Sequence, residues 1–241
     1  MKGYNKFLNI LLIIFIIILL GVAGYYFYLL YDNYQSNKIA NELITEFSEA
    51  TAEIETNDAE NEVIDEPIDT EENEEPNTET PPNTSPTQGR SNTAVAQNHN
   101  PGTYYGGYKV IGIIEIPSLN VKYPIFDVDN TKTLSLGTAA IYPMNVEQAL
   151  NKHGNVVIAG HNYRNSRMFS KIHTLKNDDL IYITDIYGKK VAYKVYNNYT
   201  ADVTDFNYAT RYVDEGFAEI SLSTCTNNVN TRTVIWAKAE I

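Results

Sequence analysis

The chain is poor in the residues from which disulfide frameworks and metal sites are built. Only one of its 241 residues is cysteine, and four are histidine. A single cysteine excludes an intrachain disulfide framework and a zinc site made mainly of cysteines. Basic residues are also scarce, with 18 Lys and Arg against 30 Asp and Glu and a formal net charge of −12. This balance excludes a nucleic-acid partner bound through a basic face, because phosphate contacts need an excess of lysine and arginine.

The negative charge is confined to one part of the sequence. Residues 32–86 hold 17 acidic residues and a single lysine, which gives that segment a charge of −16. Residues 1–31 carry +2, and residues 108–241 are almost neutral, with 13 acidic and 14 basic residues. We therefore expect three parts with different structures.

An uncharged apolar run of 24 residues lies near the N-terminus, from Phe7 to Leu30. About 20 such residues in a helix cross the hydrocarbon core of a bilayer. The run ends in tyrosine and phenylalanine residues, which are typical of a membrane surface. The sequence therefore predicts a transmembrane helix at 7–31. A cleaved signal peptide is the alternative, although its possible cleavage site, Val22-Ala23-Gly24, falls inside the apolar run.

The charges on either side of the run predict its orientation. Lys2 and Lys6 precede the run and acidic residues follow it, so the positive-inside rule places the N-terminus in the cytoplasm. We expect a cytoplasmic tail at 1–6, one pass through the cell membrane, and an extracellular remainder.

Residues 32–107 are predicted to form an acidic linker. Within it, residues 33–55 repeat apolar side chains at helical spacing and predict a possible helix, which either continues the span or associates with the membrane or with itself. Residues 56–107 are acidic, contain several prolines and have few large apolar side chains, so they are expected to be disordered. The linker would then be an extended spacer between the membrane and a folded domain.

The remaining residues, 108–241, are numerous enough to form one domain with a core. Their apolar runs are short, rich in valine, isoleucine and tyrosine, and separated by turn residues, which is typical of an all-β sandwich or barrel. The predicted strands cover residues 109–116, 121–126, 155–160, 180–185, 190–201, 217–224 and 232–241, with short helical turns at 146–151 and 168–173.

Three chemically distinctive residues stand at the ends of predicted strands: His161, Cys225 and Arg232. A cysteine thiolate can attack a carbonyl carbon, and a neighbouring histidine or arginine stabilises the thiolate. An arginine can also donate hydrogen bonds to the oxyanion that forms during acyl transfer. An inert, buried cysteine in a tethered, non-catalytic surface-binding module is the alternative.

These motifs resemble those of the sortases, the membrane-anchored cysteine transpeptidases of Gram-positive bacteria. The resemblance is carried by LSTC ending at Cys225, AGH ending at His161, NTRTVI around Arg232, and IEIP at 114–117. The family motif is Thr-Leu-x-Thr-Cys, and this chain departs from it by having Ser221 in the first place. The resemblance covers nearly all of the predicted domain and implies an all-β fold, an eight-stranded sortase-type β-barrel with one or two short helices.

The resemblance also implies a mechanism. Cys225 would attack a peptide bond in the C-terminal sorting signal of secreted proteins and form a thioester. His161 would protonate the leaving amine and then deprotonate the incoming amine, and Arg232 would bind the sorting signal and stabilise the oxyanion. The incoming amine would belong to a cell-wall precursor or, in a pilin-polymerising sortase, to a lysine.

Three neighbouring residues are candidates for substrate binding: Ser223, Thr224 and Asn162, the last also for orienting the imidazole of His161. Since the Asp-Pro-aromatic lid motif of pilin-building sortases is lacking, a wall-anchoring enzyme is favoured and the sortase class stays open. Calcium-dependent sortases place several acids before the catalytic histidine, and residues 138–160 of this chain contain only Glu147. The resemblance therefore implies no calcium requirement, and we expect no other metal and no cofactor. A cysteine peptidase or a wall cross-linking enzyme is a further alternative, although such cross-linkers place an arginine two residues after the cysteine.

Overall fold

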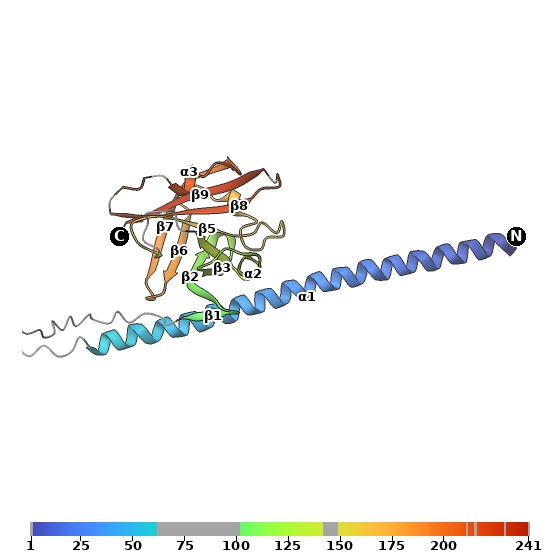
Figure 1. Cartoon of the computed structure of the whole chain (residues 1–241), viewed down its shortest axis with the longest axis horizontal. Coiled ribbons are helices and arrows are strands. Elements are labelled where there is room, and N and C mark those ends of the chain that lie inside the picture. The colour runs from blue at the N-terminus through green and yellow to red at the C-terminus, as the bar shows by residue number, and fades with distance from the viewer. Residues whose placement is uncertain are drawn as a thin grey trace, which may run out of the picture.

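The protein consists of a barrel of strands that rests on one side of a long N-terminal helix (Figure 1). This helix, α1 (Lys2–Asn61), extends far beyond the barrel at its N-terminal end. The computed structural model describes residues 2–61, 102–141, 149–210, 212–214, 216–228 and 230–240.

The strands form one sheet in the order β1-β2-β3-β4-β5-β8-β9-β7-β6, and β2 also pairs with β6. This last pairing closes β2 to β9 into a ring of eight strands, while β1 extends the sheet from β2 outside the ring. The predicted eight-stranded barrel is therefore confirmed. The strands are β1 Thr103–Tyr105, β2 Tyr108–Ile116, β3 Val121–Phe126, β4 Thr138–Ile141, β5 Gly154–Ala159, β6 Leu180–Asp185, β7 Lys190–Asp202, β8 Phe217–Cys225 and β9 Thr231–Glu240.

Alternating apolar side chains fill the inside of the barrel. Ile114 and Ile116 of β2 and Ile181 and Ile183 of β6 are fully buried there, since successive residues of a strand point to opposite faces. Phe169, in the segment after β5, enters the same core. The short helices are η1 Pro117–Leu119, α2 Thr131–Leu136, η2 Ile172–Thr174 and α3 Asn207–Thr210.

The structure contains elements that the sequence patterns did not predict. Strand β1 begins at residue 103, ahead of the expected domain start at 108, and β4 and α2 were not predicted. The first predicted helical turn, 146–151, lies mostly outside the described residues. In place of the second, at 168–173, the chain forms turns that lead into η2.

Helix α1 runs without interruption through the expected span, 7–31, and the possible second helix, 33–55. It is long and apolar enough to cross a membrane. The rest of the expected linker, residues 62–101, lies outside the described residues.

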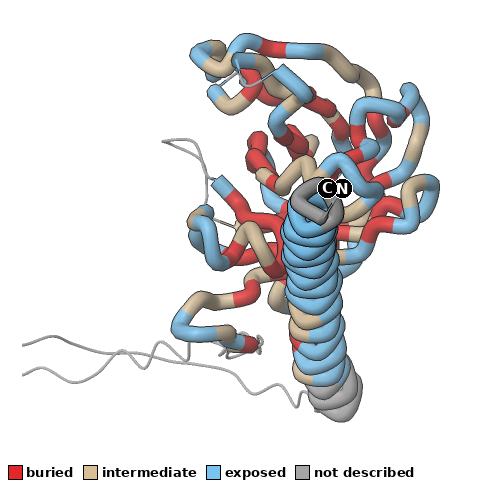
Figure 2. Tube along the Cα trace, turned by 90° about the vertical axis from the view of Figure 1, so that its right-hand side faces the viewer, coloured by how far each residue is buried: buried red, intermediate tan, exposed pale blue. Residues whose placement is uncertain are grey.

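The second half of α1 packs against the outer surface of the barrel. Leu43, Ile44 and Phe47 form an apolar cluster with strands β2, β3 and β4, and Phe47 is completely buried. These side chains recur every three or four residues and so lie on one face of the helix. Figure 2 looks along α1 and shows the near, N-terminal part exposed on all sides, with the barrel to one side of the helix. The barrel side of the cluster consists of Val110, Ile113, Phe126, Leu136 and Ala139.

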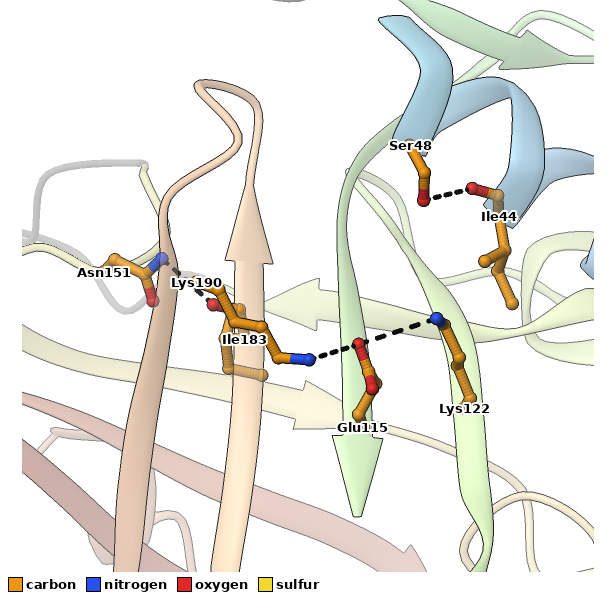
Figure 3. A network of polar contacts seen from close by, with 7 residues as sticks. All are labelled: Ile44, Ser48, Glu115, Lys122, Asn151, Ile183 and Lys190. Carbon is orange, nitrogen blue, oxygen red and sulfur yellow. Dashed lines mark hydrogen bonds and ion pairs between the residues drawn. The ribbon is translucent and has the colours of Figure 1, made fainter. Parts of the chain in front are cut away.

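Polar contacts link β2 to its neighbour β3 and, across β6, to β7 where the barrel closes. Glu115 of β2 accepts a hydrogen bond from Lys190 Nζ at 2.9 Å, and Lys122 Nζ of β3 lies 3.6 Å from the same carboxylate (Figure 3). Both lysines are about half exposed, and surface pairs of this kind contribute about 0–1 kcal/mol. The stability of the barrel therefore comes mainly from its closed ladder and its core.

Candidate active site

Cys225 and Arg232 lie directly opposite each other on adjacent strands. Cys225 is the last residue of β8, Arg232 is the second residue of β9, and the antiparallel register pairs the two. Directly opposite residues of an antiparallel pair point to the same face. Arg232 Nη1 lies 3.8 Å from Cys225 Sγ, and the free thiol is exposed. The register of one strand pair thus places a cationic donor beside an accessible nucleophile.

The guanidinium of Arg232 has a further donor that no protein group uses. Its Nε is buried and has no hydrogen-bond partner among the described residues. A buried donor without a partner costs about 1–3 kcal/mol.

His161 reaches the same end of the barrel from a parallel strand. It follows β5, which runs parallel to β8 with Ala159 opposite Ser223. The ladder continues one step further, where Gly160 N donates to Ser223 O at 3.1 Å. Because parallel strands end at the same edge of a sheet, His161 and Cys225 leave the barrel side by side.

Two side-chain hydrogen bonds join these strand ends. Asn162 Nδ2 donates to the backbone oxygen of Cys225 at 2.8 Å. Thr224 Oγ1 donates to the backbone oxygen of Gly160 at 2.6 Å. They tie the segments before and after His161 to the two residues that end β8.

The three residues predicted to bind substrate therefore lie in different surroundings. Ser223 and Thr224 are only 4% and 3% exposed, and the Thr224 hydroxyl is engaged with Gly160. Asn162 is partly exposed and lines a polar pocket at this end of the barrel. Of the three, Asn162 is the one whose side chain lines open space.

The segment after β5 forms a tight loop, residues 161–169, which we call the histidine loop. Phe169 N donates to His161 O at 3.1 Å and closes it. Arg164, Ser166 and Met168 adopt left-handed backbone conformations, with φ of 57°, 70° and 46°. Such conformations are costly in residues other than glycine and cluster at functional sites. Phe169 fixes one end of the loop in the barrel core.

The imidazole of His161 is half-buried and packs against the ring of Tyr163, which in turn contacts Arg167. Burial lowers its pKa below the ordinary value of 6.5, because the less polar surroundings disfavour the imidazolium. The ring of Tyr163 packs edge-on against it, with 5.2 Å between the ring centroids. The guanidinium of Arg167 lies 5.0 Å from the centroid of the Tyr163 ring. The neutral form of His161 is therefore favoured near pH 7, as a general base requires.

A polar pocket of about 560 Å³ opens at this end of the barrel, and its lining includes Asn162 and Thr226 but not Cys225, His161 or Arg232. Two basic side chains, Arg164 and Lys171, line it together with His173, and its lining includes no acidic residue. Among the described residues, no group of three or more His, Cys, Asp or Glu side chains is placed to hold a metal ion. The remaining lining residues are Ser166, Ser170, Thr200, Asn227, Asn228 and Thr233.

Sequence reasoning did not predict the contact between Arg167 and α1. Arg167 Nη1 donates to Asn33 Oδ1, and these residues are 134 positions apart in the chain. Neither residue belongs to a motif or to an apolar repeat. The sequence alone therefore carried no signal that could have found this contact.

Comparison with known proteins identifies the family. Residues 114–240 match the sequence profile of the family described as "Sortase domain". The match covers just over half of the chain and includes all of the residues discussed at the barrel end. The chain therefore belongs to the sortase family.

Individual relatives are similar over the same region. The chain is 33% identical to "Sortase A" of Listeria monocytogenes over 123 residues, which are 51% of this chain and 52% of that protein. It is also 33% identical to "Sortase A" of Bacillus anthracis over 118 residues, 48% of this chain and 52% of the relative. The chain thus spans about half the length of the curated relatives it matches.

Among solved structures, "Sortase A from Corynebacterium diphtheriae" is 25% identical to the chain, with a TM-score of 0.49. The similar region covers 64% of this chain and 72% of that one. Membership of the family supports a transpeptidase function, of either the surface-anchoring or the pilin-polymerising kind.

Proposed function

We propose that the protein is a cysteine transpeptidase that cleaves the C-terminal sorting signal of secreted proteins and transfers the acyl group to an amine of a cell-wall precursor. One observation carries the proposal. The exposed thiol of Cys225 is paired by strand register with Arg232, whose Nη1 lies 3.8 Å from the sulfur, at the barrel end where His161 also emerges. An inert structural cysteine would be expected to be buried and to have no guanidinium beside its sulfur.

In the first half-reaction the Cys225 sulfur attacks the carbonyl carbon of the scissile peptide bond. The thiol proton passes to His161, and the carbonyl oxygen becomes an oxyanion that accepts hydrogen bonds from Arg232. Collapse of this intermediate breaks the C–N bond. His161 gives its proton to the departing amine, and a thioester to Cys225 remains.

In the second half-reaction an amine attacks the thioester carbonyl. His161 removes a proton from the attacking nitrogen, and Arg232 again stabilises the oxyanion. The C–S bond then breaks, the sulfur recovers its proton, and a new amide links the two substrates. The lowered pKa of His161 fits this cycle, because the imidazole must be neutral at the start of each half-reaction.

The anchoring variant is preferred to the pilin-polymerising one. Both curated relatives are named Sortase A, and the sequence lacks the lid motif expected of pilin builders. The alternative with a lysine amine as acceptor uses the same three residues and differs only in the nucleophile. A non-catalytic surface-binding module is disfavoured by the exposure of the thiol.

The N-terminal half of α1 would anchor the enzyme in the cell membrane, with its N-terminus in the cytoplasm and the barrel outside. Its composition and complete exposure support this placement. The two lysines before the apolar run support the orientation.

The test uses the full chain, inserted in nanodiscs, with a library of sorting-signal peptides and an amine nucleophile. We expect an amide product with a wild-type sequence and none with Cys225→Ala. Mass spectrometry should also detect the acyl group on Cys225 when the amine is omitted. Product formation that Cys225→Ala leaves unchanged, or no product with any peptide, would contradict the proposal.

A further inference from the structure

Helix α1 contacts the barrel at two separate levels. Near its middle, Leu43 and Phe47 are buried in the apolar cluster against β2, β3 and β4. Ten residues before Leu43, Asn33 accepts a hydrogen bond from Arg167 of the histidine loop. Two contacts at different heights fix both the position and the direction of a straight helix relative to the barrel.

The contact between Asn33 and Arg167, which we call the upper contact, also involves the residues next to His161. Burial raises the pKa of the Tyr163 phenol, the Arg167 guanidinium opposes that rise, and the carboxylate of Asp32 on α1 adds to it by a smaller amount. Tyr163 in turn packs against His161 and beneath Arg167. The first polar residues after the apolar run therefore adjoin the surroundings of the catalytic histidine.

The apolar run ends at Leu30, only three residues before Asn33. At 1.5 Å per residue, three residues advance the helix by about 5 Å. The helix is continuous here, so no flexible segment separates the run from the contact. If the run spans the bilayer, the histidine loop lies about one helical turn above the hydrocarbon surface.

The opposite end of the barrel is farther along α1. The turn between β6 and β7 lies at the other end from Arg232, because β7 and β9 are antiparallel and Ala201 pairs with Arg232. Ile186 of this turn packs against the cluster of Leu43 and Phe47. That cluster is 10 to 14 residues beyond Asn33, or about 15–21 Å farther from the end of the apolar run. The C-terminus, at the end of β9, also points away from the N-terminal half of α1 (Figure 1).

Charge at this end of the barrel matches an anionic lipid surface. Residues 161–171 contain Arg164, Arg167 and Lys171 and no acidic residue. The side chains of Arg164 and Lys171 are exposed and form what we call the basic rim, whereas the guanidinium of Arg167 is engaged with α1. On α1 beyond the upper contact, by contrast, Glu42, Glu46 and Glu49 follow one another. Each lysine or arginine near an anionic surface contributes about 1 kcal/mol to binding it.

We propose that α1, packed rigidly against the barrel, acts as a strut: it holds the basic rim, and with it the barrel end that carries Cys225, against the outer face of the bilayer. The inference rests on the membrane topology proposed above. Cys225 would then meet sorting signals that emerge from the same bilayer, within a few residues of their own membrane segments. A barrel joined to the span by a flexible linker would instead sample many distances from the membrane and many orientations.

Energy transfer to labelled lipids measures this geometry without requiring activity. In a Cys225→Ala background, which has no other cysteine, one donor dye is placed at Lys171→Cys on the rim. A matched donor is placed at Lys189→Cys, in the exposed turn at the opposite end. The full chain is inserted in nanodiscs of neutral and anionic lipids that carry acceptor dyes on their headgroups. We expect transfer from position 171 to exceed transfer from position 189 about two-fold or more, given the ~15–21 Å offset.

Two variants separate docking from mere tethering. Leu43→Asp with Phe47→Asp removes the apolar contact, and we expect transfer from the two positions to become nearly equal. Asn41→Asp with Thr45→Asp adds the same charge on the exposed face of the helix and should leave the difference intact. Should the first variant fail to fold, a flexible insertion of about ten glycine and serine residues between Gln35 and Ser36 frees the span and leaves the docked segment unchanged. It should lower transfer from position 171.

Equal transfer from both positions in the unaltered helix would overturn the strut, as would a difference that survives both the undocking pair and the insertion. Absence of transfer from both positions would overturn the topology together with the strut. Neither result bears on the transpeptidase chemistry, which depends on the peptide assay with Cys225→Ala.

Discussion

The two halves of the active site are built by different means. Cys225 and Arg232 face each other across one antiparallel strand pair, so the register of β8 and β9 sets their separation. His161 stands on a loop with three left-handed residues. Side-chain hydrogen bonds from Thr224 and Asn162 join that region to β8.

This difference indicates how substitutions should affect each half of the site. A shift of one residue in the pairing of β8 with β9 would turn the apolar side chains of a strand away from the core. This register is therefore strongly fixed, and with it the relative position of Cys225 and Arg232. Changes in this half should alter chemistry and leave geometry intact. Changes in the histidine half should alter geometry, because a short loop and two side-chain hydrogen bonds hold it in place of a long strand ladder.

The largest effect is expected in the strand-borne half, for Arg232→Lys. A lysine ammonium cannot reproduce the fork of a guanidinium beside the thiol. We expect kcat for amide formation to fall about 10²- to 10³-fold, the usual cost of losing an oxyanion donor. The melting temperature should stay within experimental error. A variant with wild-type turnover would contradict the role given to Arg232.

The next effect concerns the link between the halves at Thr224. Thr224→Val removes the hydroxyl that donates to Gly160 O and leaves that buried oxygen unpaired. We expect the free energy of unfolding to fall by about 1–3 kcal/mol, and turnover to fall about ten-fold, or ~1.4 kcal/mol, as His161 moves. Denaturant titration and steady-state rates measure the two effects. Thr224→Ser keeps the hydroxyl and should restore both, and a valine variant indistinguishable from the serine variant would refute the link.

A smaller effect is expected for Asn162→Ala. The lost hydrogen bond to Cys225 O is partly exposed, so its net contribution is about 0.5–1.5 kcal/mol. We expect kcat to fall about 2- to 10-fold with little change in KM. Asn165→Ala is the control, since Asn165 lies in the same loop and accepts from Arg167 N without reaching β8. Equal losses in both variants would show that the loop as a whole matters, and not this link.

The smallest effect is a displacement in pH. Burial lowers the pKa of His161, so the acidic limb of kcat/KM should have its midpoint below pH 6.5. The unfolded chain then takes up this proton before the folded one does. Stability is therefore complete above the unfolded value of about 6.5 and declines as the pH falls from there toward the folded pKa. Nuclear magnetic resonance titration of the imidazole checks the direction, and a midpoint at or above 6.5 would be inconsistent with it.

Strands with many apolar residues could be predicted from the sequence, and short ones could not. The runs that form β2, β3, β5, β6, β7, β8 and β9 alternate or repeat apolar residues. Strand β4 has only four residues, TAAI, and β1 has three, TYY, so neither is long enough to show a period. Their pairing partners decide their structure, since β3 and β5 flank β4 and β2 holds β1.

The active site divides in the same way. The sequence singled out His161, Cys225 and Arg232 because each follows or opens an apolar strand, and the barrel brings all three to one end. The contact of Arg167 with Asn33 depends on where a helix docks against a closed barrel. The apolar face of residues 40–51 indicates that something covers it, but no pattern in the sequence names the strands that do so.

Because α1 is packed on the barrel, the acidic connection between Asn61 and Gly102 does not set the distance between the barrel and the membrane. Both of its ends join elements that are held on the barrel, α1 and β1. The connection therefore joins two points of the same unit, α1 packed on the barrel. Its length does not affect the distance between the barrel and the membrane. By chain entropy alone, halving or doubling the length of a loop changes its closure free energy by only about 0.6 kcal/mol. Insertions and deletions in this stretch are thus nearly neutral for reach, whereas one residue added between Leu30 and Asn33 would rotate the barrel about the span by roughly 100°.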